Sequence, residues 1–395
     1  MQRAQGWAGN NMVVEIIAFP VLAAWSYLAI GRGAFWRCAE RDDETSPAPR
    51  TWPRLAVVIP ARDEAEGIGN CLESLCRQDY PGNYSVVLVD DNSSDGTADV
   101  ARRAASMCGA QDRLTVVSGA PLPRGWTGKL WALSQGIDAA MAFDPPPQYL
   151  LLSDADIVYT PSILGWLVAH AAARDQVLTS LMVKLRCDSL AERFLIPAFI
   201  FFFQMLYPFA WVNRRDRAAA AAAGGCMLIH ARTLREAGGI EAIRDALIDD
   251  CALARMLKAK GRIWLGLTER VASIRGYPGW SDIGRMISRS AYAQLGYSPV
   301  WLVVTVAAMV LIFLAPTAAA LAGSGYGRLC GVGAWLIMAV LFRPTLRLYR
   351  RSPLWGLALP AIACAYLMFT INSALQTLRG KGGLWKGRFQ AVRAK

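Results

Sequence analysis

The sequence predicts an α/β protein with a largely parallel sheet, joined to membrane helices at both ends of the chain. Between residues 55 and 183, short apolar runs alternate with helical segments, which is typical of a parallel sheet covered by helices on both faces. Long apolar segments flank this region on both sides. The 395 residues are 54% hydrophobic yet 18% charged, so neither a purely soluble domain nor a pure membrane bundle fits the composition.

The N-terminal segment is predicted to be a membrane anchor, within residues 1–35. Residues 12–31 are apolar for about the length that a bilayer requires, and no small-residue cleavage site follows them, as a signal peptide would need. Three basic residues come next: Arg32, Arg37 and Arg41. By the positive-inside rule they place the linker 36–53 and the following domain in the cytoplasm.

The polar region, residues 54–295, contains the predicted sheet. The expected strands are 55–60, 85–91, 114–118, 149–154 and 176–183, and the expected helices between them are 64–77, 95–107 and 127–141. Ligands bind at the carboxyl ends of the strands in such sheets. Acidic residues directly after a strand are therefore the first candidates for a functional site.

The remaining apolar segments pose a topology problem. Residues 194–212 carry no charge and could be taken for a membrane crossing. A crossing there would place the polar helix that follows on the opposite side of the membrane from the sheet. We therefore expect an in-plane or re-entrant helix at the membrane interface. A buried core helix is the alternative. Three more segments lie within 296–378: 300–322, 329–342 and 354–375. Basic residues follow the second segment and fill the tail, 379–395. If both basic regions are cytoplasmic, one of the three segments does not cross.

Charge and cysteine content narrow the classes of partner. The net charge of +12 lies largely beside apolar segments, which indicates an anionic bilayer surface as a partner. The polar half has no Lys/Arg tract with interleaved aromatic residues, which argues against nucleic acid. Nine cysteines without a CxxC pair, and only two histidines, argue against a structural zinc site. The thiols are typical of small buried residues in a reducing compartment.

Asp154 and Asp156 follow the apolar strand 149–154 directly, in the stretch YLLLSDADIVYTP. Two carboxylates at this spacing suit a hard divalent cation, Mg²⁺ or Mn²⁺, that shares ligands with substrate phosphates. A helix-capping turn is the simpler explanation, since Thr160-Pro161 has the form of an N-cap with proline at the first helical position. Both can hold, because the cap comes after the acids.

Two further groups of polar residues follow strands. In VDDNSSDGT, Asp91 is placed to accept hydrogen bonds from a nucleoside, while Ser94 or Asp95 would cap the next helix. In IPARDE, Glu64 suits the first turn of a helix and Arg62 is free to face a phosphate.

Two more motifs lie near predicted helix starts. GWTGK is not a Walker loop, but its glycines and Lys129 are able to hold a diphosphate; a solvated lysine is the alternative. In IDDCAL, Asp249 and Asp250 suit a helix dipole, and one of them is also a candidate general base.

Taken together, the motifs resemble family 2 glycosyltransferases with a GT-A fold. The matching order is VVIPARDE, VDDNSSDGT, GWTGK, SDADI, AAGGCMLI and IDDCAL, followed by an apolar C-terminal region and GLWKGRF. The GWTGK segment, the RSAYAQLGYSP junction and the WKGR tail look most like hopene-associated glycosyltransferases. The chain is more distantly similar to ceramide glucosyltransferase-like enzymes.

The resemblance implies roles for individual residues. It implies nucleotide-sugar contacts from Pro60, Ala61, Arg62, Glu64, Asp91, Lys129 and Asp154. It implies a metal bound by Asp156 and Asp154, and a base at Asp250 beside Asp249, which replaces the family's glutamate. The family's Q/R-x-x-R-W segment is not intact, since RMISRSAYAQLGY has no tryptophan. Arg285 and Arg289 are the candidates there for diphosphate contacts.

The implied activity is transfer of a sugar, expected from a UDP-sugar, to a lipid acceptor such as a hopanoid, by an inverting enzyme of the inner (cytoplasmic) membrane. A processive polysaccharide synthase is one alternative, although three C-terminal segments are few for a translocation channel. A catalytically silent membrane protein that binds nucleotide sugars or serves as a scaffold is the other, and the ordered set of acids argues against it.

Overall fold

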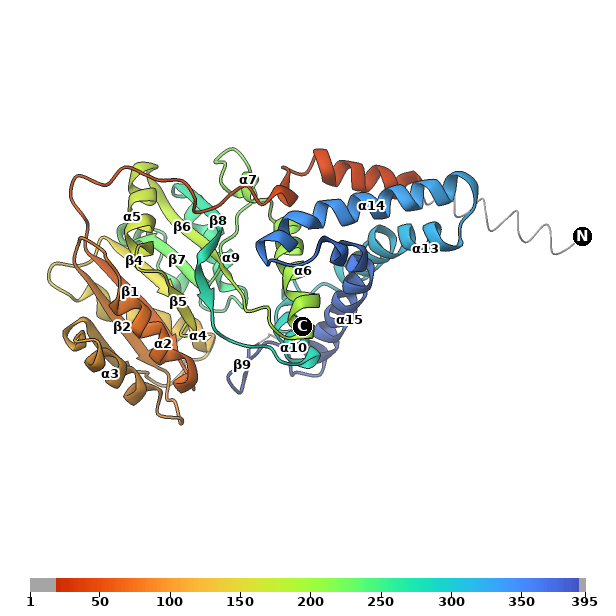
Figure 1. Ribbon diagram of the computed structural model, residues 1–395. Helices are drawn as coiled ribbons and strands as arrows, with labels where there is room; N and C mark the ends of the chain where they lie inside the picture. Colours follow the sequence, from red (N-terminus) through yellow and green to blue (C-terminus); the bar gives the residue numbers. More distant parts are fainter. Residues whose placement is uncertain (1–18, 391–395) are drawn as a thin grey trace, which may run out of the picture.

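The computed structural model describes residues 19–390 and shows a sheet domain beside a group of long helices (Figure 1). Of the predicted anchor, residues 19–30 form a helix, and residues 12–18 lie outside the described range. The last five residues of the basic tail lie outside it as well.

The sheet domain is built on one eight-stranded sheet in the order β3-β2-β1-β4-β7-β6-β8-β5. Its strands are β1 (Leu55–Ala61), β2 (Tyr84–Asp90), β3 (Leu114–Ser118), β4 (Tyr149–Ser153), β5 (Ile157–Tyr159), β6 (Gln176–Lys184), β7 (Cys226–His230) and β8 (Arg262–Ser273). The predicted strands all form, and each end lies within one residue of its expected position.

The sheet is mixed, which corrects the prediction of a largely parallel one. β1 pairs in parallel with β2 and β4, β2 with β3, and β6 with β8. β7 runs antiparallel to both β4 and β6, and β5 runs antiparallel to β8. The antiparallel strands, β5 and β7, are the ones that the apolar pattern did not predict. β5 has only three residues, and β7 follows an alanine run that hides where it begins.

Helices cover both faces of the sheet, as predicted. On β1, Leu55, Val57 and Ile59 belong to one hydrophobic cluster, whereas Ala56 and Val58 belong to another. The first cluster contains residues of α2 (Ala65–Cys76), α3 (Thr97–Met107) and α5 (Ile163–Ala173). The second contains residues of α4 (Gly128–Met141) and α9 (Asp249–Lys258) and continues into the C-terminal helices.

The start of α5 differs from the expected cap. The helix begins at Ile163, with Ser162 at the N-cap position, and Thr160 instead offers its backbone carbonyl to the Ile163 N–H at 3.2 Å. Residues 160–162 are therefore a turn between β5 and α5. Thr160 does not cap the helix and Pro161 does not occupy its first position.

Within residues 19–390, four helical segments are long and apolar enough to cross a membrane, judged by length and composition. They are Leu190–Val212, Pro299–Ala322, Gly325–Leu348 and Pro353–Leu378. In order, they comprise α6 (Leu190–Leu206) and α7 (Phe209–Val212), then α12 (Pro299–Met309), η4 (Val310–Leu314) and α13 (Ala315–Ala322), then α14 (Gly325–Leu348), and last η5 (Pro353–Ala358) and α15 (Leu359–Leu378). These helices suggest association with a membrane.

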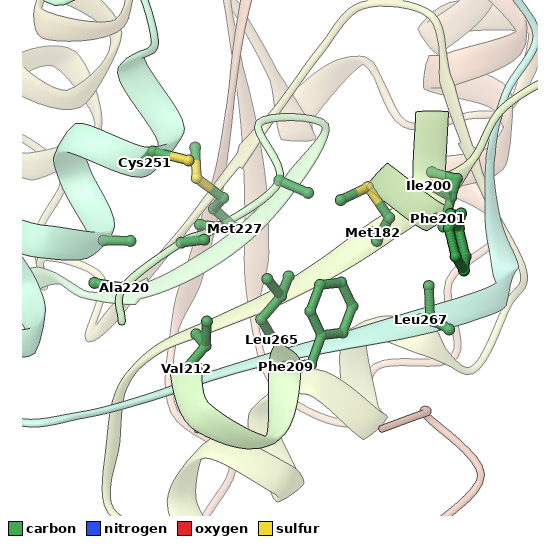
Figure 2. Packing of buried hydrophobic residues seen from close by; sticks show 14 of the residues in the cluster. Met182, Ile200, Phe201, Phe209, Val212, Ala220, Met227, Cys251, Leu265 and Leu267 are labelled. Atoms are coloured by element: carbon green, nitrogen blue, oxygen red, sulfur yellow. The ribbon is translucent and has the colours of Figure 1, made fainter. Parts of the chain in front are cut away.

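α6 lies at the junction between the sheet and the C-terminal helices (Figure 1). Ser189 and Glu192 form a capping box at its start, which fixes where the helix begins. Ile200 and Phe201 pack in the same hydrophobic cluster as Met182 of β6 and Leu265 of β8 (Figure 2). The helix therefore joins the two parts of the molecule through its buried face.

The chain ends in a small hairpin after α15. β9 (Leu384–Trp385) and β10 (Arg388–Phe389) are antiparallel and are joined by Lys386 and Gly387. Both turn residues have positive φ, 45° and 81°, as a two-residue hairpin turn of this hand requires. The remaining short elements are η1 (Phe35–Arg37), η2 (Gln111–Arg113), α8 (Ala231–Glu236), η3 (Ile240–Ile243), α10 (Trp280–Ser288) and α11 (Ala291–Gln294).

Candidate active site

The predicted acids gather where β1, β2 and β4 end and where α4 and α9 begin. Most of their carboxylates contact a basic side chain from another part of the chain. The acids are therefore held close together without leaving their charges uncompensated.

Lys129 is the centre of one cluster. Its ammonium lies 2.9 Å from Oδ1 of Asp154 and 3.1 Å from Oδ2 of Asp249, which joins the end of β4 to the start of α9. Burial alone would lower the pKa of Lys129, but these two carboxylates outweigh burial and raise it. Lys129 therefore stays protonated and presents a fixed positive charge between the carboxylates of Asp154 and Asp249.

Asp250 differs from its neighbour in both contacts and acidity. Its Oδ2 accepts a hydrogen bond from the Gly224 N–H at 3.1 Å, and its Oδ1 accepts one from the Cys251 N–H at 2.7 Å. Burial and the charge of Asp249 raise the pKa of Asp250 to about 6, although Lys129 and the two N–H groups oppose the rise. A carboxylate with such a pKa is a suitable general base near neutral pH.

Gly224 is the residue of the AAGGC segment that approaches this cluster. A β-carbon at this position would lie 3.2 Å from Nζ of Lys129 and 3.6 Å from Oδ2 of Asp250. The first of these distances is tighter than ordinary van der Waals contact. A side chain here would press on the lysine, so glycine keeps both groups in place.

Asp156 belongs to a second cluster that sequence reasoning did not find. Its Oδ2 accepts hydrogen bonds from the Ser273 hydroxyl at 2.6 Å and from Nε of Arg275 at 3.3 Å. Arg275 also donates to both oxygens of Glu64, at 2.7 and 2.8 Å. Burial disfavours the charge on Arg275, but Asp156 and Glu64 outweigh it and raise the pKa.

The ends of β1 and β2 are held together beside these clusters. The buried residues Pro60 and Ala61 end β1, and the Ala61 carbonyl accepts from the Asp91 N–H at 2.8 Å. Arg62 donates to the Asp91 carbonyl at 2.6 Å. Only 2% of Asp91 is exposed, so its carboxylate is almost completely desolvated.

The C-terminal hairpin reaches this same place from the far end of the chain. Arg388 donates to both carboxylate oxygens of Asp91, at 2.7 and 3.4 Å. Lys386 lies 2.8 Å from Oε1 of Glu64 and donates to the Asp63 carbonyl at 2.8 Å. Two acids that were predicted to bind the nucleoside therefore face basic residues of the tail.

The two arginines predicted for the diphosphate lie in different places. Arg289 lines a small cavity together with Thr127, Lys129, Asp249 and Gln390. Arg285 is largely exposed and pairs with Asp282 on its own helix, α10. The structure thus brings Arg289 to the cluster around Lys129 and leaves Arg285 outside it.

The donor atoms at the site fit Mg²⁺ or Mn²⁺. Within residues 19–390, no group of three His, Cys, Asp or Glu side chains surrounds a common metal position. Such a cage is not required, because these ions are often held by one or two carboxylates together with substrate phosphates and water. Asp154 and Asp156 supply hard oxygen ligands of this type, and Glu64 reaches Asp156 through Arg275.

The residues that were missed fall into two groups with different causes. Arg275 and Ser273 lie at the carboxyl end of β8, a strand that the sequence pattern did not reveal. Lys386 and Arg388 lie in the WKGR tail, which entered the resemblance as a motif and the charge pattern as a basic segment, without a role for either residue. Recognition of β8 would have placed Arg275 among the candidates, because polar residues at strand ends were the guide elsewhere. The charge sequence of the tail carries no comparable signal.

The sheet domain matches a family of glycosyltransferases. The profile of the family described as "Glycosyltransferase like family 2" matches residues 53–269, which include Glu64, Asp91, Asp154, Asp156, Asp249 and Asp250. Glycosyltransferase AglE of Haloferax volcanii is 33% identical over 94 residues, or 24% of this chain and 30% of that protein. An N-acetylglucosaminyltransferase of Rhizobium leguminosarum bv. viciae is 29% identical over 156 residues, or 39% of this chain and 32% of that protein. The matches thus span about a third of the length of these curated relatives.

A solved structure shares the fold over almost the whole chain. It is the mannosyltransferase PcManGT from Pyrobaculum calidifontis, determined in complex with GDP-Man and Mn²⁺. The two chains superpose with a TM-score of 0.57 at 21% identity, covering 92% of this chain and 99% of that one. The similarity shows a common fold.

Proposed function

Because the chain belongs to glycosyltransferase family 2, we propose that it moves a sugar from a nucleotide sugar to a lipid acceptor at the membrane interface. The family match shows a family 2 glycosyltransferase, and the GT-A-like mixed sheet supports the use of a nucleotide sugar as donor. The lipid acceptor, the inverting mechanism and the role of each residue are the proposal. It rests chiefly on one observation: Lys129 joins Asp154 at the end of β4 to Asp249 at the start of α9, directly beside Asp250.

The proposed reaction is a single displacement. The carboxylate of Asp250 takes the proton of the acceptor hydroxyl, and that oxygen bonds to the anomeric carbon from the face opposite the leaving group. The bond from the anomeric carbon to the diphosphate oxygen breaks at the same time, and its electron pair stays on the diphosphate. The configuration of the sugar is therefore inverted.

The other residues hold the donor. Asp91 accepts a hydrogen bond from the nucleoside. The end of β1, with Pro60 and Ala61, and the following Arg62 form the wall of the site beside the nucleoside. Lys129 and Arg289 lie where a diphosphate would gain from positive charge. When bound by Asp156 and Asp154, Mg²⁺ or Mn²⁺ supplies charge that stabilises the leaving diphosphate.

The position of the site supports a lipid as acceptor. A cavity of about 620 Å³ lies where α14 ends against β6 and β8. Its lining includes Arg350 and Arg351 from the end of α14, and also Ser273, which donates to Asp156. We assign this cavity to the approach of a lipid headgroup. The relatives described above carry neither a hopanoid nor a ceramide in their names, so a hopanoid acceptor remains a prediction from the resemblance alone.

Contacts along α14 support a topology for the C-terminal segments. The indole N–H of Trp335 donates to the Leu357 carbonyl at 3.1 Å, and a β-carbon at Gly356 would lie 2.7 Å from the Ala339 carbonyl oxygen. Trp335 lies 13 residues before the end of α14 at Leu348, or roughly 20 Å along a helix. Thus η5 runs back beside α14 after the chain has reached the cavity.

The second half of Pro353–Leu378, helix α15, returns toward the sheet domain. The Ser288 hydroxyl of α10 donates to the Phe369 carbonyl of α15 at 2.9 Å, and the hairpin that follows α15 contacts Asp91. Both ends of Pro353–Leu378 therefore face the sheet domain. We propose that this segment enters and leaves the bilayer on one side, which resolves the conflict between the two basic regions.

Reporter fusions test this topology. A fusion after Ser352 and a fusion after Lys381 are expected to report the same side of the membrane, and a fusion after Gly323, between α13 and α14, is expected to report the other side. Alkaline phosphatase and green fluorescent protein provide opposite signals for the two sides. Opposite signals after Ser352 and Lys381 would show that Pro353–Leu378 crosses.

The pKa of Asp250 predicts the pH dependence of transfer. The base works as a carboxylate, so kcat/KM should fall as pH drops through about 6, with a slope approaching tenfold per pH unit below it. The charged groups facing Asp250 are Asp249 on α9 and Lys129 on α4. Asp249→Asn removes a like charge and should shift the acidic limb to lower pH. An unchanged limb in this variant would argue against Asp250 as its source.

A donor panel tests the proposed function as a whole. The full chain in detergent or nanodiscs is incubated with UDP- and GDP-sugars, and release of nucleotide is measured with Mn²⁺ and with EDTA. Metal-dependent release from at least one donor is expected. A protein that only binds nucleotide sugars would show no release under any of these conditions, which would contradict the proposed activity.

A further inference from the structure

The C-terminal hairpin, residues 384–389, has no place in the reaction described so far. It is 297 residues away from Asp91 in the sequence, yet Arg388 donates to both oxygens of that carboxylate. Lys386 contacts one oxygen of Glu64, Oε1, at 2.8 Å. A solvated basic tail would not need two specific partners inside a predicted donor site.

These contacts compensate charges that would otherwise be costly. Asp91 is almost fully buried, and an unpaired buried carboxylate is strongly unfavourable. Arg62 is 3.8 Å from the Asp91 carboxylate, whereas Arg388 lies at 2.7 Å with a second contact. Arg388 is therefore the main charge partner of Asp91, and it arrives on a segment outside the sheet domain.

The hairpin is also connected to the residues expected at both ends of a bound donor. The nucleobase would be at Asp91, and the diphosphate would be near the metal ligand Asp156. Lys386 is linked to Asp156 through Glu64 and Arg275, in contacts of 2.8, 2.7 and 3.3 Å. Arg388 thus contacts the acid expected at the nucleobase end of the donor, and Lys386 is linked to the acid expected at the diphosphate end.

We propose that the hairpin 384–389 is part of the donor site, and that Lys386 and Arg388 bind the diphosphate of the nucleotide sugar. This inference rests on the proposed function. In the ligand-free chain the two side chains hold Glu64 and Asp91, and on donor binding they turn to the phosphate oxygens while the nucleobase takes Asp91. The two positive charges of Lys386 and Arg388 then neutralise the two negative charges of the diphosphate.

The backbone of the turn supports a positioning role. Lys386 has φ 45°, a left-handed conformation that costs a non-glycine residue free energy, and the Asp63 carbonyl holds its ammonium. Arg62 in turn donates to the Lys386 carbonyl at 3.3 Å. The hairpin is thus fixed to the loop after β1 through both its backbone and its side chain.

Equilibrium binding tests the inference without relying on turnover. UDP-glucose and GDP-mannose are titrated by calorimetry into the full chain with Mn²⁺, and the tighter ligand is used for the variants. Lys386→Ala and Arg388→Ala are each expected to weaken binding about tenfold or more, since each removes a charge-assisted contact. Lys381→Ala, on the exposed residue just before the hairpin, is the matched control and should bind as the unmodified chain does.

Protection from trypsin provides a second readout on the unmodified chain. Donor with Mn²⁺ should slow cleavage after Lys386 and Arg388, while cleavage after the exposed Arg50 in the linker continues at its original rate. Unchanged or tighter binding by both hairpin variants, or faster cleavage with donor, would overturn the inference and indicate a segment that blocks the site. If the unmodified chain binds neither nucleotide sugar, the proposed function itself is contradicted.

Discussion

Replacing Asp250 by asparagine is expected to lower the rate of sugar transfer by about 10²- to 10⁴-fold, the usual contribution of a general base. The amide keeps the size of the side chain and can still accept from the Gly224 N–H. It cannot take a proton from the acceptor hydroxyl. Donor affinity should therefore change little, so the loss should appear in kcat. Initial rates at saturating donor, combined with donor titration by calorimetry, measure the two quantities separately.

Asp245→Asn is the matched control for this variant. Asp245 is exposed and lies just before α9, so its replacement removes one negative charge near the site without touching the proposed base. Its kcat should equal that of the unmodified enzyme. Full activity in Asp250→Asn would assign the base to another group, and an equal loss in both variants would indicate a general charge effect.

Replacing Asp156 by asparagine is expected to produce the second large effect, a loss of metal-dependent donor binding. Asp156 offers a buried carboxylate that accepts hydrogen bonds from Arg275 and Ser273, and an amide is a much weaker ligand for a hard divalent cation. Affinity for Mn²⁺ in the presence of nucleotide sugar should fall by about 10- to 100-fold or more. Loss of a residue that only hydrogen-bonds to a metal ligand already has an effect of this size, and loss of the ligand itself should be at least as large. The signal of free Mn²⁺ in electron paramagnetic resonance measures this directly.

The exposed Asp79 supplies the control, as Asp79→Asn, since it lies on the same domain away from the strand ends. It should bind Mn²⁺ as the unmodified chain does. Metal affinity that is retained in Asp156→Asn but lost in Asp154→Asn would exchange the roles of these two acids. Retention in both single variants would place the metal elsewhere.

Local patterns predicted the first half of the sheet well. Strands β1, β2 and β4 are continuous apolar runs because both of their faces are buried, and such runs are visible in the sequence. β8 was missed because Glu269 and Arg270 interrupt it where it faces solvent and its partner β5 has only three residues. The antiparallel strands β5 and β7 make the sheet mixed, and neither has a clear apolar pattern in the sequence.

Pairs that are distant in sequence account for the rest. The acids at strand ends could be proposed because each lies next to a local signal. Their partners could not, since Arg275 is 119 residues from Asp156 and Arg388 is 297 residues from Asp91. The charge of the tail predicts an acidic or anionic partner, but the sequence does not identify it. The fold shows that Arg388 pairs with Asp91.

Transfer of label into lipid tests the central claim most directly. Membranes containing the enzyme are incubated with radiolabelled UDP- and GDP-sugars and Mn²⁺, then extracted with butanol. We expect label from one donor in the lipid phase, absent with EDTA and absent in membranes that contain Asp250→Asn. Label that appears only as free sugar, or only in a polymer that remains insoluble in the extraction, would contradict transfer to a lipid acceptor.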